Sequence, residues 1–184
     1  MKHRIYLRAL NPDDYKVSVK WRNDPAIQEM IGGPKYFVSP ERERQWVENA
    51  IISKDKIVLA VCLIENDQYI GNVMLQDIDW INRTARVPYM IGDKSVWGKG
   101  YATEARMLML KFAFEERNLR RISAVVLEDN IASLRVNEKC GFKKEGLLRK
   151  SVFKNGKYHN QYILGLLKEE FDEAYKKYCE VDNE

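Results

Sequence analysis

The chain has 184 residues, of which 45% are hydrophobic and 32% are charged, and its formal net charge at pH 7 is +4. This length and balance predict one globular domain, spanning 1–184, with a full hydrophobic core. The absence of any apolar run of about 18 residues excludes a membrane-spanning helix, and the small, scattered positive charge argues against a nucleic-acid partner.

The first residues lack the apolar core of a signal peptide, so a cytoplasmic location is expected. The cysteines (Cys62, Cys140 and Cys179) are far apart and form no CxxC pair, and His3 and His159 are the only histidines. Neither a disulfide nor a bound metal is therefore expected. Cys140, which precedes a Gly-Phe pair, is interpreted as a small buried residue rather than a nucleophile.

Capping residues and apolar spacing predict the helices. Asn11 and Pro12 begin a helix that should end near Arg22, the segment 32–34 is a break, and Ser39 caps the next helix. The helices expected are 12–22, 39–51, one that follows the glycine-rich stretch after residue 96, 129–141 ending at Gly141, and 168–180. The third carries its core-facing residues at Ala105, Leu108, Met109, Phe112 and Ala113.

Alternating or continuous apolar runs predict about seven strands. They are expected at 5–10, 56–65, 69–80, 84–91, 121–128, 143–153 and 158–167. Gly71 marks a bulge, and Asn155-Gly156 predicts a tight hairpin between the last two strands. The fold class that follows is α/β (α+β), with a single mixed, mostly antiparallel sheet flanked by helices.

The stretch VWGKGYATEA, residues 96–105, follows a strand and opens a helix. Gly98 and Gly100 permit positive φ angles and close approach of a ligand to the backbone. The free amides of the helix's first turn favour an anion such as a pyrophosphate. A Walker motif is absent, and the dinucleotide fingerprint is broken by Thr103.

Three segments together resemble the GNAT superfamily of acetyl-CoA-dependent N-acetyltransferases. They are the turn Trp97-Gly98-Lys99-Gly100-Tyr101-Ala102, the helical segment NIASLRVNEKCGF and the hairpin FKNGKYHNQYIL. The resemblance covers about 69–167 and is nearest to the branch of spermidine, ribosomal-protein N-terminal and amino-sugar acetyltransferases. The segment 21–25 resembles that branch more weakly. Trp97 stands where the family has Gln or Arg.

The resemblance implies a GNAT fold and a set of acetyl-CoA contacts. The pantetheine arm would lie beside Tyr89, Met90 and Ile91, and an amide at Met90 or Ile91 would polarise the thioester carbonyl. The pyrophosphate would lie on the turn formed by Trp97, Gly98, Lys99, Gly100, Tyr101 and Ala102. Asn130 and Ser133 would bond the arm from the other side, with Asn137 bordering it; for Asn130 the competing interpretation is helix capping.

Two positions depart from the family's catalytic pattern. Many relatives have a tyrosine acid where this chain has Asn137, and many have a glutamate where this chain has Arg86. The catalytic candidates are therefore Asp77, acting as a base through water, and Ser133 and Tyr158 as proton donors. Asp79, Glu104 and Tyr162 are weaker alternatives, interpreted as surface acids or strand packing.

The acceptor is expected on the side of the first two helices, lined by Trp21, Arg22, Asp24 and Trp80, with Trp46 as a further candidate. Acidic residues there (Asp24, Glu29, Glu41 and Glu43) would attract a polyamine. A polyamine, an amino sugar and a peptide N-terminus all remain open as acceptors. Whether the protein forms a homodimer also remains open. The alternative function is a non-catalytic acyl-CoA sensor, which Asn137 and Arg86 favour.

Overall fold

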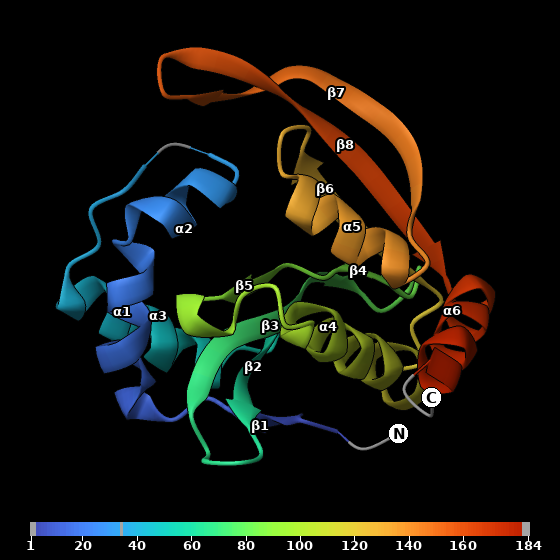
Figure 1. Ribbon diagram of the computed structural model, residues 1–184, viewed down its shortest axis with the longest axis horizontal. Coiled ribbons are helices and arrows are strands. Elements are labelled where there is room, and N and C mark those ends of the chain that lie inside the picture. The colour runs from blue at the N-terminus through green and yellow to red at the C-terminus, as the bar shows by residue number, and fades with distance from the viewer. Residues whose placement is uncertain (1–2, 34, 182–184) are drawn as a thin grey trace.

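The computed structural model describes residues 3–33 and 35–181, and within them the strands form one eight-stranded sheet (Figure 1). Of the expected break at 32–34, Pro34 lies outside the described residues. The strands are β1 (Ile5–Ala9), β2 (Ile57–Leu63), β3 (Tyr69–Asp79), β4 (Thr84–Arg86), β5 (Tyr89–Ile91), β6 (Arg121–Leu127), β7 (Lys143–Lys154) and β8 (Lys157–Leu167). The predicted fold class, a mixed and mostly antiparallel sheet flanked by helices, is confirmed.

The strand order is β1-β2-β3-β4-β6-β8-β7, with β5 paired only to β3. All neighbours are antiparallel except β4 and β6, which run parallel. The register between β2 and β3 shifts so that Ile70 is the extra residue, which places the predicted bulge beside Gly71. A Cβ at Gly71 would lie 2.3 Å from the Met90 carbonyl oxygen, so only glycine lets β5 approach β3 there.

The expected single strand at 84–91 is wrong: it is two short strands, β4 and β5, separated by Val87 and Pro88. Pro88 has no N–H to donate to a ladder. Both strands pair with β3, but only β4 continues onto β6, where Arg86 is the last residue in register with Ser123. The sheet therefore splits between β5 and the second half of β6.

The helical elements include a short helix that the sequence patterns did not predict, α2. They are a 3-10 turn (Pro12–Asp14), α1 (Tyr15–Arg22), α2 (Pro25–Met30), α3 (Pro40–Ile51), a 3-10 turn (Lys94–Val96), α4 (Tyr101–Lys111) continued by a π-helical turn (Phe112–Glu116), α5 (Ile131–Lys139) and α6 (Lys168–Val181). Asp24 caps α2 by accepting from the Ala26 amide, with Pro25 at its first position. Ser39 caps α3 as predicted.

Two hydrophobic cores cover the two faces of the sheet. The larger packs α4 and α6 against it and includes the predicted Ala105, Met109 and Ala113, which are fully buried. The smaller packs the first helices against β1–β3 around Trp21. Cys140 is fully buried in the larger core, and burial raises the pKa of its thiol to about 11. That supports its interpretation as a core residue rather than a nucleophile.

The β7–β8 hairpin turns at Asn155 and Gly156, both with positive φ, as the sequence predicted. In Figure 1 the long hairpin arches over the molecule toward α2. Its Lys154 is 3% exposed, and Nζ donates to the carbonyl oxygens of Gln28, Glu29 and Ile31 at 2.5–2.8 Å. The hairpin tip thereby holds the C-terminal end of α2. None of the helices within 3–33 and 35–181 is long and apolar enough to cross a membrane.

Candidate active site

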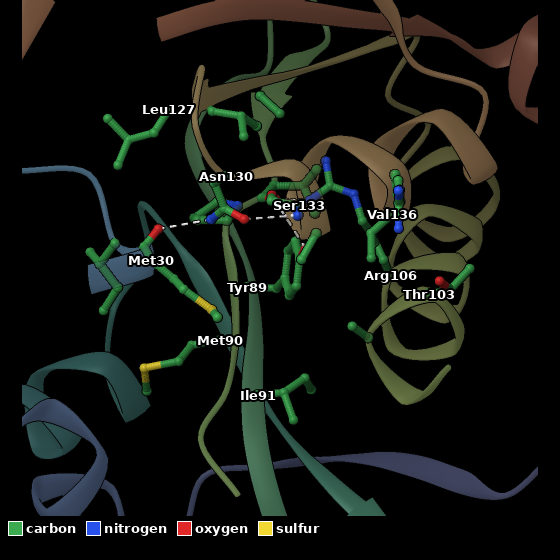
Figure 2. Close-up of a pocket in the computed structure, with 18 of the residues that line it drawn as sticks. Met30, Tyr89, Met90, Ile91, Thr103, Arg106, Leu127, Asn130, Ser133 and Val136 are labelled. Carbon is green, nitrogen blue, oxygen red and sulfur yellow. Dashed lines mark hydrogen bonds between the residues drawn. The ribbon is translucent and has the colours of Figure 1, made fainter. Parts of the chain in front are cut away.

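The split in the sheet opens a cleft of about 570 Å³, within the range of small-molecule sites. One wall is β5, the facing wall is the second half of β6, and the N-terminal ends of α4 and α5 complete it. Figure 2 shows Tyr89, Met90 and Ile91 on one side and Leu127, Asn130 and Ser133 on another. Four residues of α2 and the loop after it close the remaining side: Ile27, Met30, Ile31 and Gly32.

Strand β5 presents unpaired backbone groups to this cleft. Met74 N–H donates to the Pro88 carbonyl, and Gly92 N–H donates to the Ile70 carbonyl. Because bonded pairs alternate along an antiparallel ladder, Met90 is also turned toward β3. The amides of Tyr89 and Ile91 therefore face the cleft, where an extended ligand can pair with them as a strand would.

The glycine-rich turn lies at one end of the cleft. Gly98 and Gly100 have φ of 77° and 87°, values that side-chain-bearing residues rarely adopt. Trp97, Gly98, Gly100, Tyr101 and Ala102 line the cleft, whereas the Lys99 side chain does not. Instead the Lys99 carbonyl accepts from Arg4 Nη1 at 2.9 Å. The turn thus leads into the first residues of α4 beside the cleft, and binding of an anion to its backbone amides stays a prediction.

Asn130 and Ser133 lie together at the start of α5. The Asn130 side chain accepts from the Ser133 amide at 2.9 Å, which caps the helix, and its Nδ2 donates to the Met30 carbonyl at 2.9 Å. Figure 2 shows these bonds at the mouth of the cleft. Capping therefore does occur, and both residues also line the cleft. Asn130 additionally holds α2 in place.

Asn137 lies behind Ser133 rather than in the cleft lining, and it is 1% exposed. Its Oδ1 accepts from Arg106 Nη2 at 2.6 Å, and its Nδ2 donates to the Ser133 carbonyl at 2.7 Å. The sequence reasoning missed Arg106. Its signal was a charged residue next to Ala105, on the apolar face of an amphipathic helix.

The remaining catalytic candidates lie outside the cleft lining. Asp77 is exposed and paired with Arg86, whose Nε is 2.8 Å from Oδ2. Tyr158 is 65% exposed near the hairpin tip and stacks on Phe153. Of the three candidates, the structure brings only Ser133 to the cleft.

The weaker alternatives have structural partners. Asp79 accepts from the amides of Ile81 and Asn82 in the β3–β4 turn. Glu104 is 1% exposed and accepts from the Arg4 backbone amide and side chain, which fastens β1 to α4. Tyr162 packs in the sheet with Lys144 Nζ 4.1 Å from its ring centroid.

None of the four acceptor-side candidates lines the cleft. Trp21 is buried, stacks on Tyr69 and fills the space left by Gly92. Arg22 lies 3.8 Å from Glu43, Asp24 binds Lys94 at 2.5 Å, and Trp80 is exposed in the β3–β4 turn.

The charged residues that line the cleft are all cationic. They are Arg86, Arg106, Arg135 and Lys139, and no aspartate or glutamate is among the lining residues in the described part of the chain. Nor do those ranges contain a group of three or more His, Cys, Asp or Glu side chains able to hold a metal ion. Such a lining suits a long anionic ligand with an apolar arm.

Comparisons with known proteins agree with this geometry. A family model described as an acetyltransferase (GNAT) domain matches residues 4–143. The probable N-acetyltransferase YjcK of Bacillus subtilis (strain 168) is 36% identical over 170 residues, covering 89% of this chain and 93% of the relative. The ribosomal-protein-serine acetyltransferase of Escherichia coli (strain K12) is 26% identical, covering 74% and 76%.

A solved structure is similar over nearly the whole chain. It is the spermidine N-acetyltransferase from Vibrio cholerae in complex with CoA and spermine, with a TM-score of 0.84, 26% identity, and coverage of 91% of this chain and 98% of that one. A split sheet with a glycine-rich turn at the end of the split, together with these matches, defines an acyltransferase of the N-acetylating class. The chain belongs to the GNAT family of acetyl-CoA-dependent N-acetyltransferases, as its motifs predicted.

Proposed function

We propose that the protein transfers the acetyl group of acetyl-CoA to a primary amine of low pKa, of which a peptide N-terminus is the leading example. The pyrophosphate lies on the backbone amides of Gly98, Gly100, Tyr101 and Ala102, since the Lys99 amide already donates to the Val96 carbonyl. The pantetheine arm runs along β5 from Ile91 to Tyr89. The thioester then reaches the Tyr89 amide, the cleft-facing amide farther from the phosphate turn, rather than the Met90 amide, which faces β3. That amide polarises the thioester carbonyl.

The observation that carries the choice of acceptor is that no aspartate or glutamate of residues 3–33 and 35–181 lines the cleft. A peptide α-amine has a pKa of about 7.7–8.0, against about 10.4 for an alkyl amine such as that of lysine. The neutral fraction at pH 7 differs by roughly 300-fold between the two. A cleft with Arg86 in place of a glutamate base therefore suits the amine that needs less help to lose its proton.

The acidic residues that would attract a polyamine are already engaged. Asp24 binds Lys94, Glu29 binds Asn155 and Lys35, and Glu41 binds Arg44. Glu43 is buried against the Ser18 hydroxyl, 2.7 Å away. None of the four lines the cleft, whereas apolar Ile27, Met30 and Ile31 do. A neutral or apolar acceptor fits this wall better than a polycation does.

The names of two similar proteins give different acceptors: one is a ribosomal-protein-serine acetyltransferase and the other is a spermidine N-acetyltransferase. The test is release of free thiol from acetyl-CoA with spermidine, glucosamine and a serine-leading hexapeptide, each at several ionic strengths. We expect kcat/KM for the peptide to exceed that for spermidine at least tenfold and to vary little with salt. A preference for spermidine that weakens with salt overturns the acceptor class.

The same assay addresses the alternative, a non-catalytic acyl-CoA sensor. The membership of the chain in a family of named acetyltransferases does not favour it. If CoA binds and no amine releases thiol above the rate of hydrolysis, the enzymatic proposal fails and the sensor replaces it.

A further inference from the structure

Arg106 is a buried cation without a carboxylate partner. It is 1% exposed, and within the described residues no aspartate or glutamate forms an ion pair with it. Nη1 donates to the Val87 carbonyl at 2.9 Å and Nη2 to Asn137 Oδ1 at 2.6 Å, while Nε has no hydrogen-bond partner. Burying an arginine this way is costly, so its position beside the cleft suggests a role beyond packing.

The guanidinium lies against the Tyr89 ring, with 5.2 Å between its central carbon and the ring centroid. The Tyr89 hydroxyl is 3.4 Å from Ser133 Oγ, and Asn137 Nδ2 is 3.5 Å from the same oxygen. Tyr89, Ser133, Asn137 and Arg106 thus form one cluster, called here the phenol–arginine cluster. Figure 2 shows Tyr89, Ser133 and Arg106 converging on the cleft from β5, α5 and α4.

We propose that Tyr89 is the acid that protonates the departing CoA sulfur, and that Arg106 is a positioning residue that holds the phenol and favours release of its proton. This inference rests on the proposed acetyl transfer. Tyr89 would thereby supply from β5 the phenol that the α5 helix lacks at Asn137. The Tyr89 amide would then polarise the thioester carbonyl, and the Tyr89 hydroxyl would protonate the thioester sulfur.

The proton balance of this step is closed. The amine nitrogen forms a bond to the carbonyl carbon, and the C–S bond breaks with its electron pair passing to sulfur. Sulfur takes the Tyr89 proton. The amine nitrogen releases a proton, and this proton returns to the Tyr89 phenolate directly or through solvent. The products are the amide and the CoA thiol, and Tyr89 ends as it began.

The surroundings of the phenol explain why a cation is needed. Burial raises the pKa of Tyr89, which keeps it protonated at neutral pH, and the Arg106 charge acts in the opposite direction. The Ser133 hydrogen bond also lowers the pKa of Tyr89, and Cys140, at the end of α5, raises it. Val73 on β3 and Ala124 and Val126 on β6 contribute apolar groups. Because a thiol pKa is about 8.5 and a phenol pKa about 10, lowering the latter eases the transfer.

The first test compares Tyr89→Phe with Tyr162→Phe, a sheet tyrosine outside the cleft lining. With acetyl-CoA and the peptide acceptor, Tyr89→Phe is expected to lose at least ~100-fold in kcat while CoA affinity stays within about threefold. Tyr162→Phe is expected to keep its rate. A Tyr89→Phe variant with more than a tenth of the wild-type kcat overturns the role of Tyr89.

The second test separates positioning by Arg106 from a purely structural role. An acid must be protonated to act, so kcat falls as pH rises past its pKa. Arg106→Met removes the cation, which is expected to lower kcat and move the alkaline limb to higher pH, and Arg106→Lys is expected to restore part of both. If the soluble variants lose rate equally and keep the wild-type pH profile, Arg106 only supports the fold. If Arg106→Met does not fold, the difference in the alkaline limb of the pH profile between wild type and Arg106→Lys decides whether Arg106 has a positioning role.

The third test needs no acceptor and so distinguishes failure of this proposal from failure of the proposed function. The ratio of the affinities for CoA and desulfo-CoA, measured by calorimetry from pH 7 to 9, isolates the contacts made by sulfur. We expect wild type to favour CoA increasingly as pH rises and Tyr89→Phe to lose at least about threefold of that preference. An identical ratio in both proteins overturns the proposal, whichever amine is acetylated.

Discussion

The indole nitrogen of Trp97 donates a 2.8 Å hydrogen bond to the carbonyl oxygen of Ile91. This bond joins the first residue of the glycine-rich turn, Trp97 to Ala102, to the last residue of β5. The two segments that we propose to hold the pyrophosphate and the pantetheine arm are therefore fixed relative to each other before a ligand arrives. Trp97 stands where the family has Gln or Arg, and in this chain its side chain links the turn to β5.

Replacing Trp97 by phenylalanine should weaken CoA binding about fivefold. An aromatic side chain is kept, although it is smaller than the indole, while the hydrogen bond, worth about 1 kcal/mol, is lost and the turn becomes less well ordered. Calorimetry with CoA measures the change. Trp46→Phe is the matched control, because Trp46 is on α3 and outside the cleft lining, and it should leave affinity unchanged. Equal CoA affinity of Trp97→Phe and wild type would show that the Trp97–Ile91 hydrogen bond does not support CoA binding.

Gly100→Val should weaken CoA binding by more than tenfold, because its Cβ would lie 3.3 Å from Arg4 Nη2 and the turn must shift the backbone amides that we propose to hold the pyrophosphate. A positive φ also makes the substitution strained, by roughly 1–2 kcal/mol of unfolding free energy. Gly156→Val controls for the strain, since Gly156 has φ 74° in the hairpin turn and open space around it. Denaturant melts should show similar losses for both. A Gly100→Val variant that binds CoA as well as Gly156→Val does would rule out the phosphate site.

Asn137→Ala should keep at least a tenth of the wild-type kcat, because an amide cannot deliver a proton and Asn137 does not line the cleft. Its loss leaves Arg106 with one hydrogen bond fewer in a buried site, so the free energy of unfolding should fall by about 1–3 kcal/mol. Rates and melts on the same preparation test both. Asn66→Ala, in an exposed turn, is the control for stability. A fall in kcat of ~100-fold with unchanged CoA affinity would give Asn137 the catalytic role denied here.

Lys154→Met should loosen α2 without touching the phosphate turn. Three carbonyl oxygens lose a charged donor, so stability should fall by about 1.5–3 kcal/mol. Because α2 residues wall the cleft, KM for the acceptor should rise several-fold while the affinity for CoA stays constant. Lys157→Met is the matched control: it faces Lys154 across the same hairpin, is exposed, and should change neither quantity. A larger loss in CoA affinity than in acceptor KM would show that α2 supports the cofactor instead.

Local signals in the sequence were sufficient for most elements and for the conformation of the glycine-rich turn. Ser39 caps its helix, Asn155-Gly156 makes its hairpin, and Gly98 and Gly100 adopt positive φ, because each depends on the conformational preferences of adjacent residues. The helix α2 was missed since its six residues carry too short an apolar pattern, although Asp24 and Pro25 are an ordinary cap and first position.

The candidate site was less predictable, because side-chain partners are chosen by distant segments. Trp21 and Asp24 were expected to line the acceptor site. Instead the Trp21 ring packs against Gly92, and Asp24 forms an ion pair with Lys94. Arg106 escaped notice because a helix pattern shows that a residue faces inward but not what it meets there. Whether Asp77, Ser133 and Tyr158 act in catalysis stays a prediction, and only Ser133 lies in the cleft.

By itself, the sequence determined the order of most elements, the glycine-rich turn and the family, because these depend on residues close together along the chain. Only the tertiary structure decided where the sheet splits, since that depends on β4, but not β5, reaching β6 more than thirty residues later. It also decided that the charged side chains lining the cleft, within the part of the chain that the structure describes, are all cationic, and that the Arg106 guanidinium lies against the Tyr89 ring. Burial and charge pairing across the fold, rather than spacing along the chain, select which polar residues reach the site.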